Sequence, residues 1–167
     1  GALSKVGVGT QILSGSNTYT GAISLQGGTL GLGNTYGFGS GGSLTFAGGG
    51  IQFGSGVSPD VSNRFVVSGS SNVKVDAGAT SGSLSANVLN NGMLIFNRSD
   101  ALSYGGSISG SGSLVKLGAG ELTLSGTQSF AGPLTVSGGN VLLSGSLSGA
   151  GGMTLNSGAS LSGTGFV

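Results

Sequence analysis

A stretch near the N-terminus recurs 111 residues later without a gap, and this recurrence constrains the fold more than any other feature. The aligned positions are Lys5, Gly7, Gly9, Leu13, Gly15, Tyr19, Gly21, Gly27 and Gly28 in the copy at 3–33, and Lys116, Gly118, Gly120, Leu124, Gly126, Phe130, Gly132, Gly138 and Gly139 in the copy at 114–145. An ungapped recurrence of this length indicates a repeat protein, whose repeats have to be interpreted before anything else.

A shorter template also recurs, made of two small residues, one variable residue and then apolar–x–apolar. Its copies start at residues 8, 27, 48, 70, 91, 119, 138 and 157, so the spacing varies from 19 to 28 residues. Alternation with a period of two predicts short β-strands with one apolar side. Helices are not expected, because no ten-residue window with helical apolar spacing is free of Gly clusters.

Strands of three to five residues, separated by Gly, Ser and Asn corners, predict a solenoid in which the chain turns repeatedly around one axis. One such turn, here called a lap, cannot bury its apolar side chains alone and depends on its neighbours. We therefore predict an all-β, parallel β-helix of about eight laps of roughly 20 residues, with essentially no helix. It forms a single segment over residues 1–167.

The charge content argues against several classes of function. The chain has nine charged residues, a net charge of +1, and no Cys or His. This balance favours neither nucleic acid nor an anionic membrane as a partner, and it excludes a disulfide framework. No apolar run is long enough for a membrane helix and no signal peptide opens the chain, so an exported parent protein needs its signal elsewhere.

Catalytic chemistry is not expected either. The four acids, Asp60, Asp76, Asp100 and Glu121, occupy different places within their laps, although Asp76 and Asp100 lie in successive laps and could approach each other. A Ser–Lys pair around Lys116 is conceivable, but we expect this lysine to be solvated, as charged side chains usually are. We predict no enzyme activity, no cofactor and no metal site.

Two places break the period and predict protruding loops. The lap from residue 91 is six to nine residues longer than its neighbours, which we assign to a loop at 97–104, and residues 54–64 carry Pro59 and Asp60. In the first loop, Arg98, Asp100 and Tyr104 are candidate partner contacts because loops carry charged and aromatic recognition residues. The alternative is a neutral insertion in which Arg98 pairs with Asp100.

The motif Lys-x-Gly-x-Gly-x-Leu-x-Leu-Ser-Gly at 116–126 resembles the autotransporter-associated β-strand repeat, also called the passenger-associated transport repeat, of Gram-negative type V secretion passengers. The first copy has the Asn, Tyr and Gly of this family at Asn17, Tyr19 and Gly21. The second copy departs from the family pattern at Gln128, Phe130, Asn140 and Val141. Because Tyr19 and Phe130 occupy equivalent positions, we expect both to pack.

The resemblance implies a right-handed β-helix that is a fragment of a longer passenger, exported to the cell surface or secreted. It also implies that the parent's own C-terminal β-barrel translocator is a partner. Two functions are consistent with it. The first is a structural segment that promotes passenger folding and secretion across the outer membrane and displays a virulence or effector region. The second is a host-receptor, matrix or glycan binding module of an adhesin or toxin-like autotransporter, acting through the inserted loops.

Overall fold

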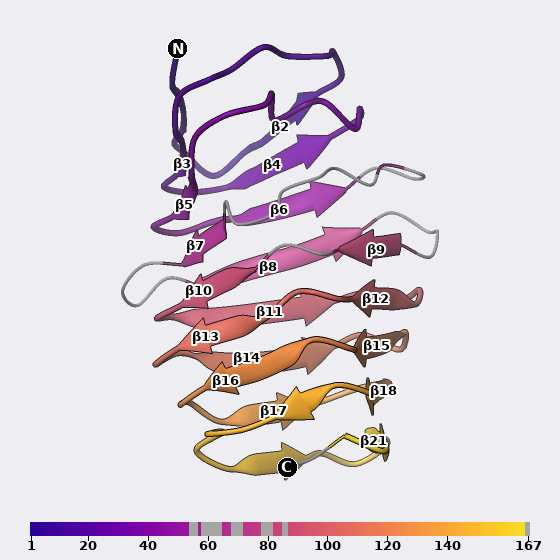
Figure 1. The fold of residues 1–167 in the computed structure, drawn as a ribbon. Helices are drawn as coiled ribbons and strands as arrows, with labels where there is room; N and C mark the ends of the chain where they lie inside the picture. The colour runs from indigo at the N-terminus through magenta and orange to yellow at the C-terminus, as the bar shows by residue number, and fades with distance from the viewer. Residues whose placement is uncertain (54–56, 58–64, 68–71, 78–81, 85–86, 166–167) are drawn as a thin grey trace.

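The computed structural model describes residues 1–53, 57, 65–67, 72–77, 82–84 and 87–165. All regular structure in these ranges is β-strand, which confirms the predicted all-β, parallel β-solenoid. Figure 1 shows the strands stacked along one axis, with the two termini at opposite ends. Within the described ranges there is thus no helix of the length and apolarity that crossing a membrane requires.

The strands form three parallel sheets, and the chain passes from one sheet to another at each corner. Sheet A stacks β1 (Leu3–Lys5), β3 (Ile23–Leu25), β5 (Leu44–Phe46), β7 (Phe65–Val67), β10 (Val88–Asn90), β13 (Ile108–Gly110), β16 (Thr127–Phe130) and β19 (Ser146–Leu147). Sheet B stacks β2 (Thr10–Leu13), β4 (Thr29–Leu32), β6 (Gly50–Phe53), β8 (Asn72–Ala77), β11 (Met93–Asn97), β14 (Ser113–Leu117), β17 (Leu134–Val136) and β20 (Met153–Leu155). Sheet C stacks β9 (Gly82–Leu84), β12 (Leu102–Tyr104), β15 (Glu121–Leu124), β18 (Asn140–Leu143) and β21 (Ser160–Gly163).

The core is a column of inward side chains that repeats from lap to lap. In sheet B, Leu94 pairs with Leu114 and Leu114 with Leu134, and all three are at most 1% exposed. The alternation of each strand sends the next residue outward, as in the pattern buried–intermediate–buried of β17. Each fully buried Leu contributes about 1.5–3 kcal/mol, so stability grows with the number of stacked laps.

The two copies of the long repeat lie on different sides of the solenoid. In the first copy, the strands β1, β2, β3 and β4 alternate between sheets A and B. Their equivalents in the second copy, β14, β15, β17 and β18, alternate between sheets B and C. The same sequence pattern therefore contributes strands to sheets A and B in one copy and to sheets B and C in the other. The same strand and corner sequences are thus compatible with all three sheets.

This rotation shows that the predicted loop at 97–104 is wrong. Leu94 pairs with Leu114, so this lap is 20 residues long, like its neighbours. Residues 102–104 form strand β12 of sheet C, paired with β15. The apparent excess arose because the template at 91 lies in sheet B and the template at 119 lies in sheet C. The other predicted loop, at 54–64, lies outside the described residues except for Val57.

The corners of the second copy leave no room for side chains, because each stacks on the backbone of the preceding lap. A Cβ at Gly120 would lie 2.0 Å from the carbonyl oxygen of Asp100, and one at Gly126 would lie 2.1 Å from that of Gly106. The equivalent glycines of the first copy, Gly9 and Gly15, have nothing within 4 Å of such a Cβ. The repeat therefore needs these glycines where another lap stacks directly against them.

We predict that Gly120→Ala lowers the free energy of unfolding by about 1–3 kcal/mol, the usual cost of overpacking. The matched variant Gly9→Ala, at the equivalent position of the first copy, should stay within about 0.5 kcal/mol of the wild type. Urea unfolding followed by far-UV circular dichroism measures both. Equal losses in the two variants would contradict the stacking argument.

Candidate functional site: the lysine corner of the repeat

Lys116 points into the solenoid, and the expectation that it is solvated is wrong. Burial alternates along β14, with Leu114 and Lys116 inside, and Lys116 is only 1% exposed. Its cross-strand neighbours are Phe96 on one side and Val136 on the other. The lysine thus occupies a place in the core column that apolar residues hold in the adjacent laps.

The ammonium group of Lys116 is paired with three backbone carbonyl groups. Nζ donates to the oxygen of Leu117 at 2.6 Å, of Gly118 at 2.8 Å and of Gly138 at 3.3 Å. An ammonium group has three donors, so its hydrogen-bonding capacity is filled. Bonds from a charged donor are stronger than neutral ones, which offsets much of the cost of burying the charge.

The geometry of the corner supplies two of these carbonyls. Gly118 has a φ of 69°, in the left-handed region that glycine tolerates best. The turn at this residue follows β14 directly, so the lysine reaches the carbonyls one and two residues further along the chain. The third carbonyl, that of Gly138, belongs to the same corner one lap later, and the side chain therefore connects two laps.

The first copy reproduces the same corner. Nζ of Lys5 donates to the oxygen of Val6 at 2.8 Å, of Gly7 at 2.9 Å and of Gly27 at 3.3 Å. The φ of Gly7 is 74°, close to that of its equivalent in the second copy. The repeat thus specifies one side-chain and backbone arrangement, which forms on sheet A in one copy and on sheet B in the other.

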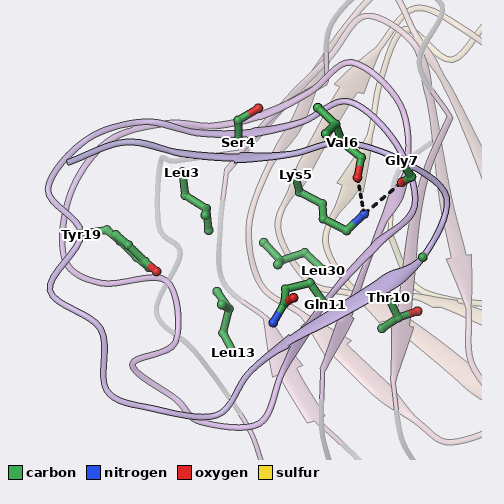
Figure 2. A pocket seen from close by; sticks show the side chains of 11 residues that line it. Leu3, Ser4, Lys5, Val6, Gly7, Thr10, Gln11, Leu13, Tyr19 and Leu30 are labelled. Carbon is green, nitrogen blue, oxygen red and sulfur yellow. Dashed lines mark hydrogen bonds between the residues drawn. The ribbon is translucent and has the colours of Figure 1, made fainter.

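Lys5 differs from Lys116 in its surroundings. Lys5 lines a hollow of about 520 Å³. Figure 2 shows it there together with the side chains of Gln11 and Tyr19. In the second copy, the lap that contains Phe96 covers the corresponding space. Accordingly Lys5 is half-buried, while Lys116 is fully buried. Burial lowers the pKa of Lys116 below its ordinary value of 10.5, because the charged form loses hydration.

A second polar position of the repeat also binds the backbone of an adjacent lap. Asn17 donates from Nδ2 to the oxygen of Gly37 at 2.8 Å. Its equivalent, Gln128, is fully buried, donates from Nε2 to Gly106 O at 3.1 Å and accepts from the backbone N–H of Ile108 at 2.9 Å. At the aromatic position of the repeat, Phe130 of the second copy is fully buried, and its equivalent Tyr19 in the first copy is half-buried.

The three candidate partner-contact residues do not form a protruding surface. Arg98 is 4% exposed and its Nε donates to Asp100 Oδ1 at 3.1 Å, as the local-pair alternative expected. Tyr104 is fully buried, and its ring packs edge-on against Phe96 with the centroids 5.6 Å apart. Burial raises the pKa of the Tyr104 phenol. These placements remove the geometric basis for a contact loop.

The remaining polar groups form ladders between laps. Asn140 donates from Nδ2 to Glu121 Oε2 at 2.8 Å, and Ser160 donates to Asn140 Oδ1 at 2.9 Å. Among the residues that the structure describes, no three His, Cys, Asp or Glu side chains gather where a metal ion could bind.

The sequence analysis identified the position of Lys116 in the repeat but predicted the wrong orientation for its side chain. The signal was available, since Lys116 is two residues from the inward Leu114.

We predict that Lys116→Met lowers the free energy of unfolding by about 1–3 kcal/mol, because three part-buried carbonyls lose their donor. The equivalent Lys5→Met variant should cost less, because its corner is half-exposed and water can replace the ammonium group. Urea unfolding of both variants at neutral pH measures the difference. A Lys116→Met protein as stable as the wild type would show that the bonds contribute nothing net.

The lowered pKa of Lys116 also predicts a dependence of stability on pH. Above 10.5 the lysine is neutral in both folded and unfolded chains, so the penalty for burying its charge is absent. As the pH falls from 10.5 to the lowered folded-state pKa, the unfolded chain binds the proton more tightly than the folded chain, so stability decreases over this interval and levels off below it. The stability of the wild type relative to Lys116→Met should therefore rise from neutral pH towards 10.5. A constant difference would contradict this linkage.

Comparison with known proteins agrees with the repeat geometry. Residues 3–32 and 114–143 match the passenger-associated-transport-repeat family, and these are the two segments that build the lysine corners. The chain is 28% identical to the adhesin BmaC autotransporter of Brucella suis over 162 aligned positions, which cover 68% of this chain and 5% of that protein. No solved structure matches the chain. The chain is thus a parallel β-solenoid that carries two segments matching the passenger-associated transport repeat.

Proposed function

We propose that this segment has a structural, non-enzymatic role: it promotes the folding of a longer passenger, and thereby its secretion, and it displays an effector region. The observation that carries the proposal is the lysine corner, which is formed in both repeats with the same three carbonyl acceptors. Because this pairing recurs on different sides of the solenoid, it is a property of the repeat and not of one location.

The lysine corner supports folding by favouring one register between laps. Two acceptors of Lys116 belong to its own corner, but the third, Gly138 O, is present only when the following lap is correctly placed. A buried charge with an incomplete set of partners is costly. Misplaced laps are therefore disfavoured more strongly than they would be by apolar packing, which tolerates sliding of similar side chains.

Passenger homology implies export of the parent protein to the cell surface or the medium. In this proposal the segment passes through the parent's C-terminal translocator before it folds. Glycine-rich corners and a low charge content suit such a path, because the chain restacks outside while burying few ions.

Adhesion is the second candidate function, and it is favoured by the name of the relative, an adhesin. The proposed contact residues do not support it, since Arg98 and Tyr104 are buried. A host receptor, matrix protein or glycan would have to bind outward side chains of the strands instead.

The test uses the full-length parent protein in its own cells. We expect Lys116→Met, and more strongly deletion of residues 114–143, to reduce the amount of passenger at the surface while adhesion per exposed molecule stays the same. Val115→Thr, at the outward neighbour on the same strand, is the control and should leave export unchanged. Normal export with lost adhesion would instead identify the segment as a binding module.

A further inference from the structure

We propose that the Asn91–Gly92 step is a deamidation site that is protected in the folded chain, and that the side chain of Asn90 provides this protection. This is the only Asn–Gly step in the sequence. Glycine has no Cβ to hinder the approach of its backbone nitrogen to the preceding side chain, so an unfolded Asn–Gly step reaches the reactive geometry easily.

The reaction needs only water. The backbone nitrogen of Gly92 loses its proton to solvent and attacks Cγ of Asn91, forming a new carbon–nitrogen bond. The bond from Cγ to the side-chain nitrogen breaks, and ammonia leaves with a proton from solvent. Water then opens the resulting succinimide at either carbonyl, giving aspartate or isoaspartate. One water molecule is consumed and one ammonia released, with no oxidation or reduction.

In the folded chain the attacking nitrogen is already engaged. The N–H of Gly92 donates to Asn90 Oδ1 at 3.1 Å. Asn90 is fully buried and is held in place by a bond from its Nδ2 to the oxygen of Ser113 at 2.8 Å. Attack on Asn91 requires Gly92 to give up this bond, and the lost bond would leave a buried acceptor without its donor.

The side chain that carries the carbon under attack is also held by the next lap. Asn91 Oδ1 accepts from the backbone N–H of Ser111 at 3.2 Å and from its hydroxyl at 3.3 Å. The N–H of Asn91 itself donates to Val67 O at 3.0 Å. Both partners belong to neighbouring laps, so the corner is fixed from above and below. Asn91 is exposed, so access of water does not limit the reaction.

Deamidation would damage this corner. Isoaspartate adds a methylene group to the backbone, while Gly112 N donates to Asn90 O and Ser113 N donates to Gly92 O, both at 2.9 Å. A lengthened corner cannot keep both of these bonds to the next lap. A chain that stays unfolded for long would therefore lose the ability to close this lap.

The experiment compares deamidation rates at residue 91 in mildly alkaline buffer, measured by peptide mapping with an isoaspartate assay. The folded wild type should react slowly and the wild type in urea quickly. Asn90→Ala, shown to be folded by circular dichroism, should react faster than the folded wild type by up to roughly tenfold, the factor that one hydrogen bond supplies. Asn87→Ala removes the acceptor of Ser107 at another corner and should leave the rate unchanged.

Equal rates in the folded and denatured wild type would overturn the proposal, and a slow, folded Asn90→Ala would overturn the role of Asn90. Should Asn90→Ala not fold, hydrogen exchange at the Gly92 amide of the wild type tests the same bond. Protection of this amide is expected, and exchange as fast as in an exposed loop contradicts the proposal.

Discussion

The direct stacking of one lap on the next is the constraint on which the rest of this structure depends. Parallel pairing at every strand places backbone over backbone, and at the corners the approach is so close that a Cβ at Gly120 would meet the carbonyl of Asp100. The glycine content of the chain follows from this approach. The scarcity of charge at inward positions follows too, because half of each strand faces a narrow apolar interior where an unpaired ion is costly.

Three of the four buried polar side chains among the described residues are held by the backbone. Lys116, Asn90 and Gln128 are each almost fully buried, and each bonds to main-chain atoms of an adjacent lap. Side chains of this kind add directionality that Leu and Val lack, since a carbonyl one lap away is within reach in only one register. Apolar packing supplies most of the stability, and these few residues add hydrogen bonds that link particular laps.

Much of the fold could be predicted from sequence. The period-two alternation and the spacing of about twenty residues are local signals, and they gave the parallel β-solenoid correctly. The side of the solenoid on which a strand lies is not a local property, because all three sheets use the same alternation and the same corners. A rotation of the repeat from sheets A and B to sheets B and C therefore looked like an insertion at 97–104. The orientation of Lys116 was missed for a different reason: the general rule that lysine is solvated outweighed its spacing of two from Leu114.

The rotation also bears on what the repeat is for. A binding surface must present the same side chains in the same direction, and the two copies face different sides of the solenoid. An internal arrangement has no such requirement, because the interior is continuous and all three sheets contribute to it. The feature that the copies share, an ammonium group bonded to three corner carbonyls, is internal. The shared feature therefore connects one lap to the next, which supports the folding role proposed above.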